Sequence, residues 1–583
     1  MGSQEMQDFP WYKIYRERGI PVTLQPYPEE PSHSFLDRAA KLNTDGGCVQ
    51  LGLTLHYRDI KAHADRLANA LTSRGVSKGD RVVTMLPTSI QFVIADAAIS
   101  KTGAVHIPCN PLEPLDSLAK KAIETSPKVL ICLVGEIEKA RYLLRETSLN
   151  QVIVTRLEDY SSTPPPVVEI PGVELLMKVI DQAQPVRSSI TYEPKVDLES
   201  LFFTGGTTGI AKCCMISHYN VVANVYQILR SRGINFEGIT TVIPILMALP
   251  LYHVYGHVMM HAAINFGAKI ILANDPRSSD EIIGLVKEYS PWAFFGVPTQ
   301  YVKLLEEKVN DFAPIGVSGS APLPPNVQNK FEESTGARIT EGYGLSEMTM
   351  SSHANVGVEK KKRGSIGIPF PDTVVKVIDV NTGEPLDLQH MIADNLTGEM
   401  LLKGPQRMVG YWPEPETGID EEGFIHTGDV VRIDEDGHFY IVDRIKDMIN
   451  VSGLKVYSRE IENVLYDHPA TKIAAAIGVP DPEKEGSEQV VVFVQLKPGY
   501  RAKIKEADYL DFLKDKVIKY AVPKSVIFLE EIPLTHMHKV DKRQLREKLK
   551  GASLILDQAA EVSVDSSKAK QPVEKEKSQN NAN

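Results

Sequence analysis

A segment rich in glycine and threonine carries the densest chemical signal in the chain. Residues 204–212 read Thr-Gly-Gly-Thr-Thr-Gly-Ile-Ala-Lys and follow a strand-like run at 201–203. Its glycines allow close backbone approach and positive φ, its threonine hydroxyls donate hydrogen bonds, and its lysine adds positive charge. These properties predict a phosphate-binding loop, with an ordinary surface loop as the alternative. A Walker A loop is excluded, because that pattern ends in Lys-Ser/Thr and here Lys212 is followed by Cys213.

Two other local patterns suggest chemistry less strongly. His253, His257 and His261 recur every four residues, and two such histidines on one helical face can bind a metal. Pro250 and Gly256 interrupt this segment and no carboxylate lies nearby in the sequence, so packed or pocket-lining histidines are favoured. The residues 316–320 nearly match the GxSxG turn of hydrolases, but the last position is serine, so a serine nucleophile is not predicted.

Several further segments occur in an order that resembles a known family. They are Gly319-Ser320-Ala321-Pro322-Leu323, Glu341-Gly342-Tyr343-Gly344-Leu345-Ser346-Glu347, Gly423-Phe424-Ile425-His426-Thr427-Gly428-Asp429, Asp443-Arg444-Ile445-Lys446-Asp447, and a Pro-x-Thr run from Pro533 to Lys539. Together with the phosphate loop, this set resembles the AMP-forming acyl-CoA synthetases of the adenylate-forming superfamily. The resemblance covers approximately residues 30 to 550.

The resemblance implies an ATP site. The implied ATP- or AMP-binding residues are Thr204, Gly205, Gly206, Thr207, Thr208, Gly209, Lys212, Ser320, Ala321, Pro322, Glu341, Gly342, Tyr343, Gly344, Ser346, Asp429 and Arg444. In the second motif, Tyr343 offers an aromatic face to adenine, Ser346 offers a hydroxyl to the α-phosphate, and Glu347 offers a hard oxygen ligand to Mg²⁺. Asp429 and Arg444 are implied to bind the ribose; a surface ion pair is the alternative.

The resemblance also assigns roles nearer the C-terminus. Lys446 is the implied hinge between a large and a small domain, and Ser452, Gly453 and Leu454 form the implied passage for the pantetheine arm of coenzyme A. Lys539 is implied to bridge the substrate carboxylate and the α-phosphate. This sequence departs from the family at four positions, where Gly205, Ala211, Cys213 and His538 replace the family's Ser, Pro, Gly and Gly.

The implied reaction joins a carboxylate to ATP, releases pyrophosphate, and transfers the acyl group from acyl-AMP to coenzyme A. The implied catalytic residues are Lys539, Glu347 and His253, and the acyl pocket comprises Tyr252, His253, Gly256, Phe295, Gly296 and Val297. An apolar pocket suits a fatty acid better than an amino acid, whose ammonium group needs an acidic partner. The alternatives are an aryl carboxylate, a carrier-protein acceptor, oxidation as in luciferases, and a catalytically silent acyl- and nucleotide-binding protein.

The elements that must position these residues follow an α/β pattern. Short β-rich runs at 81–83, 105–108, 128–134, 152–155, 269–272 and 293–297 alternate with helical patterns, which predicts mixed, mainly parallel sheets. We expect an adenylation domain at 1–445 with a β-rich subdomain of hairpins at 364–440. A small α+β lid domain is expected at 446–558, with elements at 458–466, 473–479, 490–495 and 509–519, and a disordered tail at 559–583.

Composition indicates which classes of partner and which cellular compartment to expect. The chain has 583 residues, 43% hydrophobic and 24% charged, with a formal net charge of −11 that argues against nucleic acid as a partner. Five scattered cysteines without a CxxC pair suit a reducing compartment, so a cytoplasmic protein is expected. No secretory signal or membrane-spanning segment is recognised. Peripheral membrane contact and a homodimer stay open.

Overall fold

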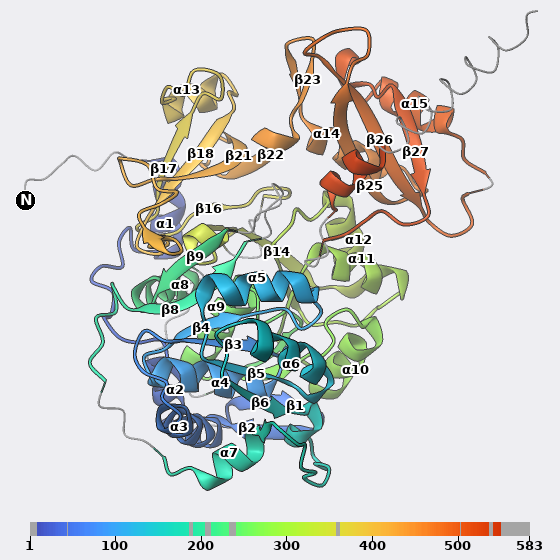
Figure 1. Ribbon diagram of the computed structural model, residues 1–583. Coiled ribbons are helices and arrows are strands. Elements are labelled where there is room, and N and C mark those ends of the chain that lie inside the picture. Colours follow the sequence, from blue (N-terminus) through green and yellow to red (C-terminus); the bar gives the residue numbers. More distant parts are fainter. Residues whose placement is uncertain are drawn as a thin grey trace, which may run out of the picture. The chain divides into compact units, whose positions relative to one another are not determined.

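The chain is divided into two compact units, Met1–Lys446 and Asp447–Asn583. The computed structural model describes residues 9–42, 45–185, 190–204, 212–231, 241–356, 362–501, 503–535 and 540–549. The elements of both units are shown in Figure 1. The expected tail at 559–583 lies outside the described residues, as do positions 205–211, 538 and 539 of the predicted site.

The first unit contains a nine-stranded sheet whose central strands are parallel. Its order is β16-β15-β14-β13-β12-β10-β11-β1-β2, and β14, β13, β12, β10, β11 and β1 run in one direction. The strands are β1 (Gly47–Gln50), β2 (Leu53–His56), β10 (Pro244–Met247), β11 (Lys269–Leu272), β12 (Ala293–Gly296), β13 (Ile315–Ser318), β14 (Arg338–Tyr343), β15 (His353–Ala354) and β16 (Ile368–Pro369). Most of these strand residues are buried, as expected for strands covered on both faces.

A second nine-stranded sheet has the order β20-β19-β9-β8-β4-β3-β5-β6-β7. Its strands are β3 (Arg81–Met85), β4 (Val105–Pro108), β5 (Val129–Leu133), β6 (Gln151–Thr155), β7 (Glu174–Leu175), β8 (Leu198–Phe203), β9 (Cys213–Ser217), β19 (Gly410–Tyr411) and β20 (Glu414–Pro415). The strands from β7 to β8 are parallel, whereas β9, β19 and β20 add antiparallel pairs at one edge. The strand runs predicted from the sequence therefore divide between two sheets.

Helices pack against both sheets of the first unit, and two of them lie inside the apolar core that the sheets share. They are α1 (Tyr12–Arg18), α2 (Ser34–Ala39), α3 (Tyr57–Ser73), α4 (Ile90–Lys101), α5 (Leu115–Thr125), α6 (Ile137–Glu146), α7 (Leu176–Gln182), α8 (His218–Ser231), α9 (Val254–Asn265), α10 (Ser279–Tyr289), α11 (Pro298–Glu306), α12 (Pro325–Thr335) and α13 (Leu388–Ala393). Every residue of α4 is buried, and α9 is buried around nearly its whole circumference. One apolar core joins both helices to strands of both sheets, so α4 and α9 are interior helices.

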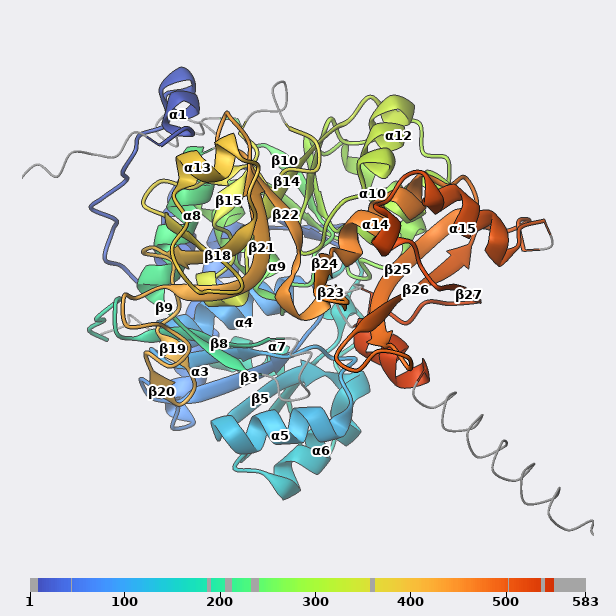
Figure 2. The same cartoon turned by 90° about the horizontal axis from the view of Figure 1, so that it is seen from above.

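The β-rich region near the end of the first unit forms a four-stranded antiparallel sheet of order β17-β18-β21-β22. Its strands are β17 (Val374–Ile378), β18 (Gly398–Lys403), β21 (Ile425–Ile433) and β22 (Phe439–Arg444). Figure 2 shows β18, β21 and β22 grouped together beside α13, and Figure 1 also labels β17 in this group. One part of this region leaves the local sheet, because Gly410 and Tyr411 pair with Met215 and Cys214 of β9.

The second unit is a small α+β unit. It contains the hairpin β23 (Ile449–Val451) and β24 (Leu454–Val456), and a three-stranded sheet of β25 (Thr471–Pro480), β26 (Glu488–Leu496) and β27 (Ser525–Leu529). Its helices are α14 (Ser458–Asp467) and α15 (Glu506–Lys514). The predicted helix at 509–519 was wrong in its bounds, because α15 begins three residues earlier and ends at Lys514. Over the parts of the chain that are described, no helix combines the length and apolarity needed to cross a bilayer.

Candidate active site

The predicted site residues of the first unit follow the carboxyl ends of parallel strands. Strand β12 ends at Gly296, β13 ends at Ser318 just before the 319–323 turn, and β14 ends at Tyr343. Because these strands are parallel neighbours, the residues that follow them meet at one edge of the sheet. Ligands of open α/β sheets bind at this edge. The topology thus places the predicted acyl segment, the predicted adenine-side turn and the Tyr343 segment next to one another.

Tyr343, Asp429 and Arg444 form one hydrogen-bonded group. The Tyr343 hydroxyl donates to Asp429 Oδ2 at 2.5 Å, and Arg444 Nε donates to Asp429 Oδ1 at 2.9 Å. Asp429 is 3% exposed, whereas the Arg444 side chain is 49% exposed. Burial and the neighbouring Asp429 raise the pKa of Tyr343 well above its usual value, so the phenol stays a donor. The Asp429 carboxylate therefore holds Tyr343, 86 positions earlier in the sequence, together with Arg444.

Glu347 is held by a residue that sequence reasoning missed. The hydroxyl of Tyr411 donates to Glu347 Oε1 at 2.8 Å, and burial together with Glu347 raises the pKa of Tyr411. Lys212 Nζ lies 4.6 Å from the centre of the Tyr411 ring, within cation–π distance. Tyr411 thereby links the predicted metal ligand to the lysine of the predicted phosphate loop. The only signal in the sequence is the Gly-Tyr-Trp-Pro run at 410–413, which does not reveal its partner.

The two ends of the predicted phosphate loop are joined by the backbone. Thr204 follows β8 and its N–H donates to the Lys212 carbonyl at 2.8 Å, while Phe203 pairs with Cys213 on β9. The loop therefore closes a β-hairpin. The central positions of the loop lie outside the described residues. They include the predicted phosphate-binding residues Gly205, Gly206, Thr207, Thr208 and Gly209, and Ala211, which replaces the family's proline. Cys213 is 1% exposed and belongs to the strand core.

Glu341 contacts the turn at 319–323, which is predicted to lie on the adenine side. Glu341 is buried, and its Oε2 accepts a hydrogen bond from the Leu323 N–H at 3.1 Å. Within the turn, Ser320 adopts a left-handed φ of 72°, Ala321 is partly buried and Pro322 is exposed. Ser320 Oγ is buried and makes no protein hydrogen bond in the described structure. The Glu341 carboxylate thus holds the end of the turn at Leu323 through a hydrogen bond.

Gly342 and Gly344 flank Tyr343 and differ in how tightly they are packed. A Cβ atom on Gly344 would lie 1.5 Å from the Met350 carbonyl oxygen, whereas one on Gly342 would meet its nearest neighbour at 3.4 Å. Only glycine therefore fits at position 344 with this backbone. Ser346 and Glu347 follow in a short 3₁₀ turn, Ser346–Met348, in which both are partly buried.

The predicted acyl-pocket residues are placed by α9 and β12. His253 caps α9, and its Nδ1 accepts from the Tyr255 N–H at 3.2 Å. A Cβ on Gly256 would lie 2.3 Å from the Pro250 carbonyl oxygen, and one on Gly296 would lie 2.5 Å from the Phe294 ring. Packing alone therefore requires both glycines. Phe295 and Val297 are buried, Tyr252 is partly buried, and burial raises the pKa of Tyr252 to about 12. Their acyl-binding role stays a prediction.

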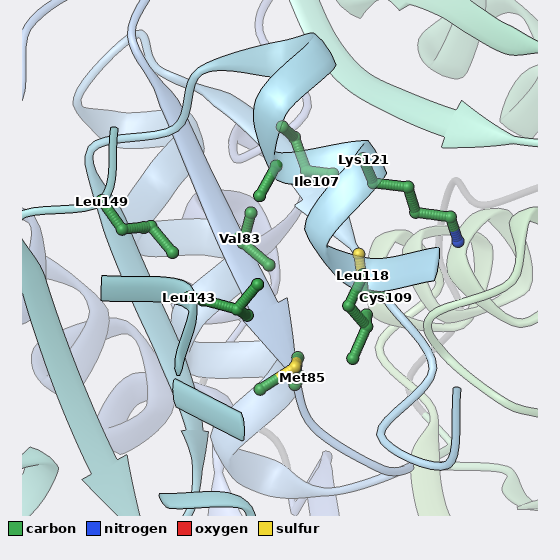
Figure 3. A pocket seen from close by; sticks show the side chains of 9 residues that line it. Val83, Met85, Ile107, Cys109, Leu118, Lys121, Leu143 and Leu149 are labelled. Atoms are coloured by element: carbon green, nitrogen blue, oxygen red, sulfur yellow. The ribbon is translucent and has the colours of Figure 1, made fainter. Parts of the chain in front are cut away.

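A small apolar cavity lies elsewhere in the first unit. Figure 3 shows its lining side chains, which come from the strands β3 and β4, the helices α5 and α6, and the segments next to them: Val83, Met85, Ile107, Cys109, Leu118, Lys121, Ala122, Leu143 and Leu149. None of the predicted acyl-pocket residues lines it. It belongs to the core beneath α5 and α6 and provides no polar group for a carboxylate other than Lys121, which pairs with Glu113.

The remaining predicted residues belong to the junction and to the second unit. Lys446 is exposed in the 3₁₀ turn Ile445–Asp447, where the first unit ends. Ser452 and Gly453 form the exposed tip of the β23–β24 hairpin with φ values of 52° and 87°, and Leu454 is 48% exposed. A Cβ on Gly453 would meet no atom within 4 Å. His538 and Lys539 lie outside the described residues.

Comparisons with known proteins agree with this arrangement. Among curated proteins, the chain is similar to the long-chain-fatty-acid–CoA ligase of Bacillus subtilis, at 35% identity over 564 residues that cover 92% of this chain and 98% of the relative. The protein of the same name from Salmonella typhimurium is 32% identical over 565 residues, covering 91% and 97%.

Solved structures show the same fold. ATP-bound MatB from Rhodopseudomonas palustris matches with a TM-score of 0.78 and 26% identity, covering 89% of this chain and 99% of that one. The anthranilate CoA ligase AuaEII with anthranoyl-AMP matches with a TM-score of 0.79 and 22% identity, covering 92% and 99%, which is a likeness of fold alone.

Family models match both parts of the chain. Residues 36–412 match the model of the AMP-binding enzymes, and residues 460–539 match the model of the AMP-binding enzyme C-terminal domain. The first match alone spans more than half of the 583 residues. The chain therefore belongs to the family of AMP-binding enzymes.

Proposed function

We propose that this AMP-forming acid–CoA ligase activates a fatty carboxylic acid, of medium or long chain, to its coenzyme A thioester. The observation that carries the proposal is the hydrogen-bonded group of Tyr343, Asp429 and Arg444, with Glu347 four positions after Tyr343, in a chain that matches long-chain-fatty-acid–CoA ligases over almost their whole length. The predicted acyl pocket supports a fatty acid, because Phe295, Val297 and Tyr252 offer apolar surface.

The first half-reaction makes acyl-AMP. A carboxylate oxygen of the acid attacks the α-phosphorus of ATP, the bond between the α-phosphorus and its bridging oxygen to the β-phosphate breaks, and pyrophosphate leaves. Two anions approach each other in this step, so a cation between them lowers its barrier. We assign that role to Lys539. Asp429 and Arg444 hold the ribose, and Tyr343 presents its ring to the adenine.

Mg²⁺ accompanies ATP in this proposal, and Glu347 is the residue that fits it. A carboxylate oxygen is the type of ligand that Mg²⁺ prefers, and the Tyr411 hydroxyl fixes the Glu347 side chain through Oε1. When bound, the ion neutralises charge on the phosphate oxygens. The Lys212 ammonium group, over the Tyr411 ring, adds positive charge on the phosphate side of the site.

The second half-reaction transfers the acyl group. The sulfur of coenzyme A attacks the acyl carbon, the bond to the AMP oxygen breaks, and AMP leaves. We assign the passage for the pantetheine arm to Ser452, Gly453 and Leu454, because this exposed hairpin tip has no Cβ at position 453. One site serves both halves when the C-terminal unit rotates about Lys446, where the two units divide.

The test is pyrophosphate release from ATP across a panel of carboxylates, with and without coenzyme A. We expect release with fatty acids of medium or long chain, thioester formation only when coenzyme A is present, and little turnover of amino acids. A preference for benzoate-like acids over every fatty acid would contradict the assigned substrate but leave the reaction class intact. Absence of pyrophosphate release with every acid would contradict the proposed activity.

A further inference from the structure

A cluster of charged side chains is buried in the first unit, outside the residues assigned to ATP, acyl group and coenzyme A. It consists of Asp96 on α4, Glu199 on β8, and His257 and His261 on α9. Their exposed fractions are 2%, 1%, 0% and 3%. Sequence spacing favours packed histidines here because no carboxylate is nearby in the chain, but the fold supplies two carboxylates from distant segments.

The nitrogen–oxygen distances within the cluster bracket the ligand spacing of a tetrahedral metal site. His257 Nε2 lies 3.0 Å from Glu199 Oε1 and 3.7 Å from Asp96 Oδ1. His261 Nε2 lies 3.3 Å from Asp96 Oδ2 and 3.5 Å from Glu199 Oε1. Zinc ligands at about 2.0–2.1 Å from the ion stand about 3.3–3.4 Å from one another in a tetrahedron. One ligand atom from each of the four residues lies within 4.8 Å of the other three, so a metal ion can contact all four after small side-chain movements.

Some polar atoms of this cluster have no hydrogen-bond partner among the described residues. Among the described residues, His261 Nε2 and Glu199 Oε2 are buried and make no hydrogen bond, although His261 Nε2 points between two carboxylates. Buried polar atoms in folded proteins are nearly always satisfied, so an orphaned nitrogen aimed at two carboxylates calls for a ligand. A cation bound by that nitrogen and both acids satisfies all of these groups at once.

The two buried carboxylates also attract a cation. Two buried carboxylates without positive charge are costly in a medium of low dielectric. Lys101, the buried lysine of α4, is already engaged by Asp37 at 2.6 Å and Asp65 at 3.0 Å. Outside the four residues, His106 supports the cluster: its Nδ1 lies 2.8 Å from Asp96 Oδ1, and its Nε2 lies 2.8 Å from Thr84 Oγ1. Metal-binding residues commonly have such outer partners.

We propose that Asp96, Glu199, His257 and His261 bind one divalent transition-metal cation of the zinc type. Imidazole nitrogens and carboxylate oxygens are ligands that Zn²⁺ accepts, and four protein ligands without an open position define a structural site. The ion is a second metal, independent of the Mg²⁺ proposed at Glu347. Its binding does not depend on the proposed reaction.

The position of the site gives it a structural role. Strand β8 carries Glu199 and ends one residue before Thr204, where the predicted phosphate loop begins. Helix α9 carries both histidines and begins at the His253 cap, beside the predicted acyl pocket. The cation thus joins the strand that leads into the phosphate loop to the helix that leads out of the acyl segment. It also ties both to the interior helix α4.

The competing occupant is a proton. Burial alone lowers the pKa of a histidine, but here Asp96 and Glu199 outweigh burial and raise the pKa of His261 to about 10. An imidazolium at this position therefore balances part of the carboxylate charge without a metal. The experiment must distinguish a metal ion from protons.

The test uses the full chain produced in medium supplemented with Zn²⁺, dialysed against EDTA and analysed for metals by mass spectrometry. We expect one zinc per chain, and X-ray absorption with nitrogen and oxygen ligands at about 2.0–2.1 Å and imidazole scattering. Production with Co²⁺ should give the strong visible bands of a tetrahedral cobalt site. Zinc-free protein after both production and refolding with Zn²⁺ would overturn the proposal and leave protons as the occupant.

Variants locate the ion. Glu199→Gln and Asp96→Asn keep side-chain size and are expected to lower zinc content at least tenfold. Glu347→Gln is the control for the nucleotide site, and His438→Gln is the control for a second group, Asp434, Asp436 and His438. Both controls should retain the zinc. Zinc lost in either control but kept in Glu199→Gln would overturn the assignment. If the two cluster variants fail to fold, the absorption spectrum and stoichiometry of the unmodified protein decide.

Discussion

Arg444 Nε donates a hydrogen bond to Asp429 Oδ1 at 2.9 Å, between residues that are paired in register on β22 and β21. The second oxygen of the same carboxylate accepts from Tyr343, which comes from a different sheet. Asp429 thereby fixes the tyrosine ring that we assign to adenine and the arginine that we assign to ribose. A substitution at any of the three residues should lower kcat/KM for ATP more than it changes KM for the carboxylic acid.

Tyr343→Phe should weaken ATP use. The substitution keeps the aromatic ring but leaves the buried Asp429 Oδ2 without its donor, and hydrogen bonds to charged groups are worth about 1.5–3 kcal/mol. We expect kcat/KM for ATP to fall roughly 10- to 100-fold, with a much smaller change in KM for the fatty acid. Tyr57→Phe, which removes a buried hydroxyl bonded to the Ala268 carbonyl, is the control. Equal losses in both variants would contradict a role specific to ATP.

Tyr411→Phe should raise the Mg²⁺ concentration needed for half-maximal pyrophosphate release. Without the Tyr411 hydroxyl, Glu347 Oε1 loses its 2.8 Å hydrogen bond and the carboxylate is less well oriented. Glu347→Gln should have a larger effect, because an amide is a poorer ligand for a hard cation. Magnesium titrations of the two variants and the unmodified enzyme provide the check. An unchanged magnesium dependence in Glu347→Gln would refute the ligand assignment.

Gly344→Ala should disrupt the segment that carries Tyr343. The added Cβ would overlap the Met350 carbonyl oxygen, so the backbone must move. We expect soluble yield or pyrophosphate release to fall at least tenfold. Gly284→Ala is a matched control in α10, where a Cβ meets no atom within 4 Å and alanine favours the helix by roughly 0.5–1 kcal/mol. A Gly344→Ala enzyme with full activity and unchanged melting temperature would show that this close approach is not required.

His353 should make the first unit less stable in acid. Burial lowers its pKa to about 3, from 6.5 in the unfolded chain, and the ring packs on Phe439 with 4.9 Å between centroids. Between pH 6.5 and 3 the unfolded state binds the extra proton, so stability falls as the pH falls, by about 1.4 kcal/mol for each unit well inside this window. Melting temperatures should show a shallower pH dependence in His353→Leu. His390→Leu, at an exposed histidine, should keep the original slope.

Lys446→Pro should separate the two half-reactions. Proline fixes φ near −65°, which restricts the rotation that we assign to this junction. With ATP, fatty acid and coenzyme A present, acyl-AMP should accumulate and thioester formation should slow more than tenfold. Lys446→Ala is the control for the side chain alone, and Lys539→Ala should show the opposite pattern, with slow adenylation and normal use of supplied acyl-AMP. An unmodified rate of thioester formation in Lys446→Pro would place the hinge elsewhere or make rotation unnecessary.

Local sequence patterns predicted many of the strands but not how distant ones meet. The runs 105–108 and 269–272 are strands in the structure, and each contains two isoleucine or valine residues that are buried, as suits sheets covered on both faces. Periodicity does not reveal that Gly410 and Tyr411 pair with β9, nearly 200 residues earlier, so Tyr411 was missed as the partner of Glu347. The sequence also did not predict the carboxylates beside His257 and His261, because tertiary packing brings Asp96 from α4 and Glu199 from β8.

Product analysis tests the central claim most directly. The full chain is incubated with ATP labelled in its adenosine, a long-chain fatty acid, Mg²⁺ and coenzyme A, and the products are separated by liquid chromatography with mass spectrometry. We expect fatty acyl-AMP and pyrophosphate when coenzyme A is withheld, and equal amounts of acyl-CoA and AMP when it is added. Formation of ADP and phosphate, or acyl-CoA without AMP, would contradict the account.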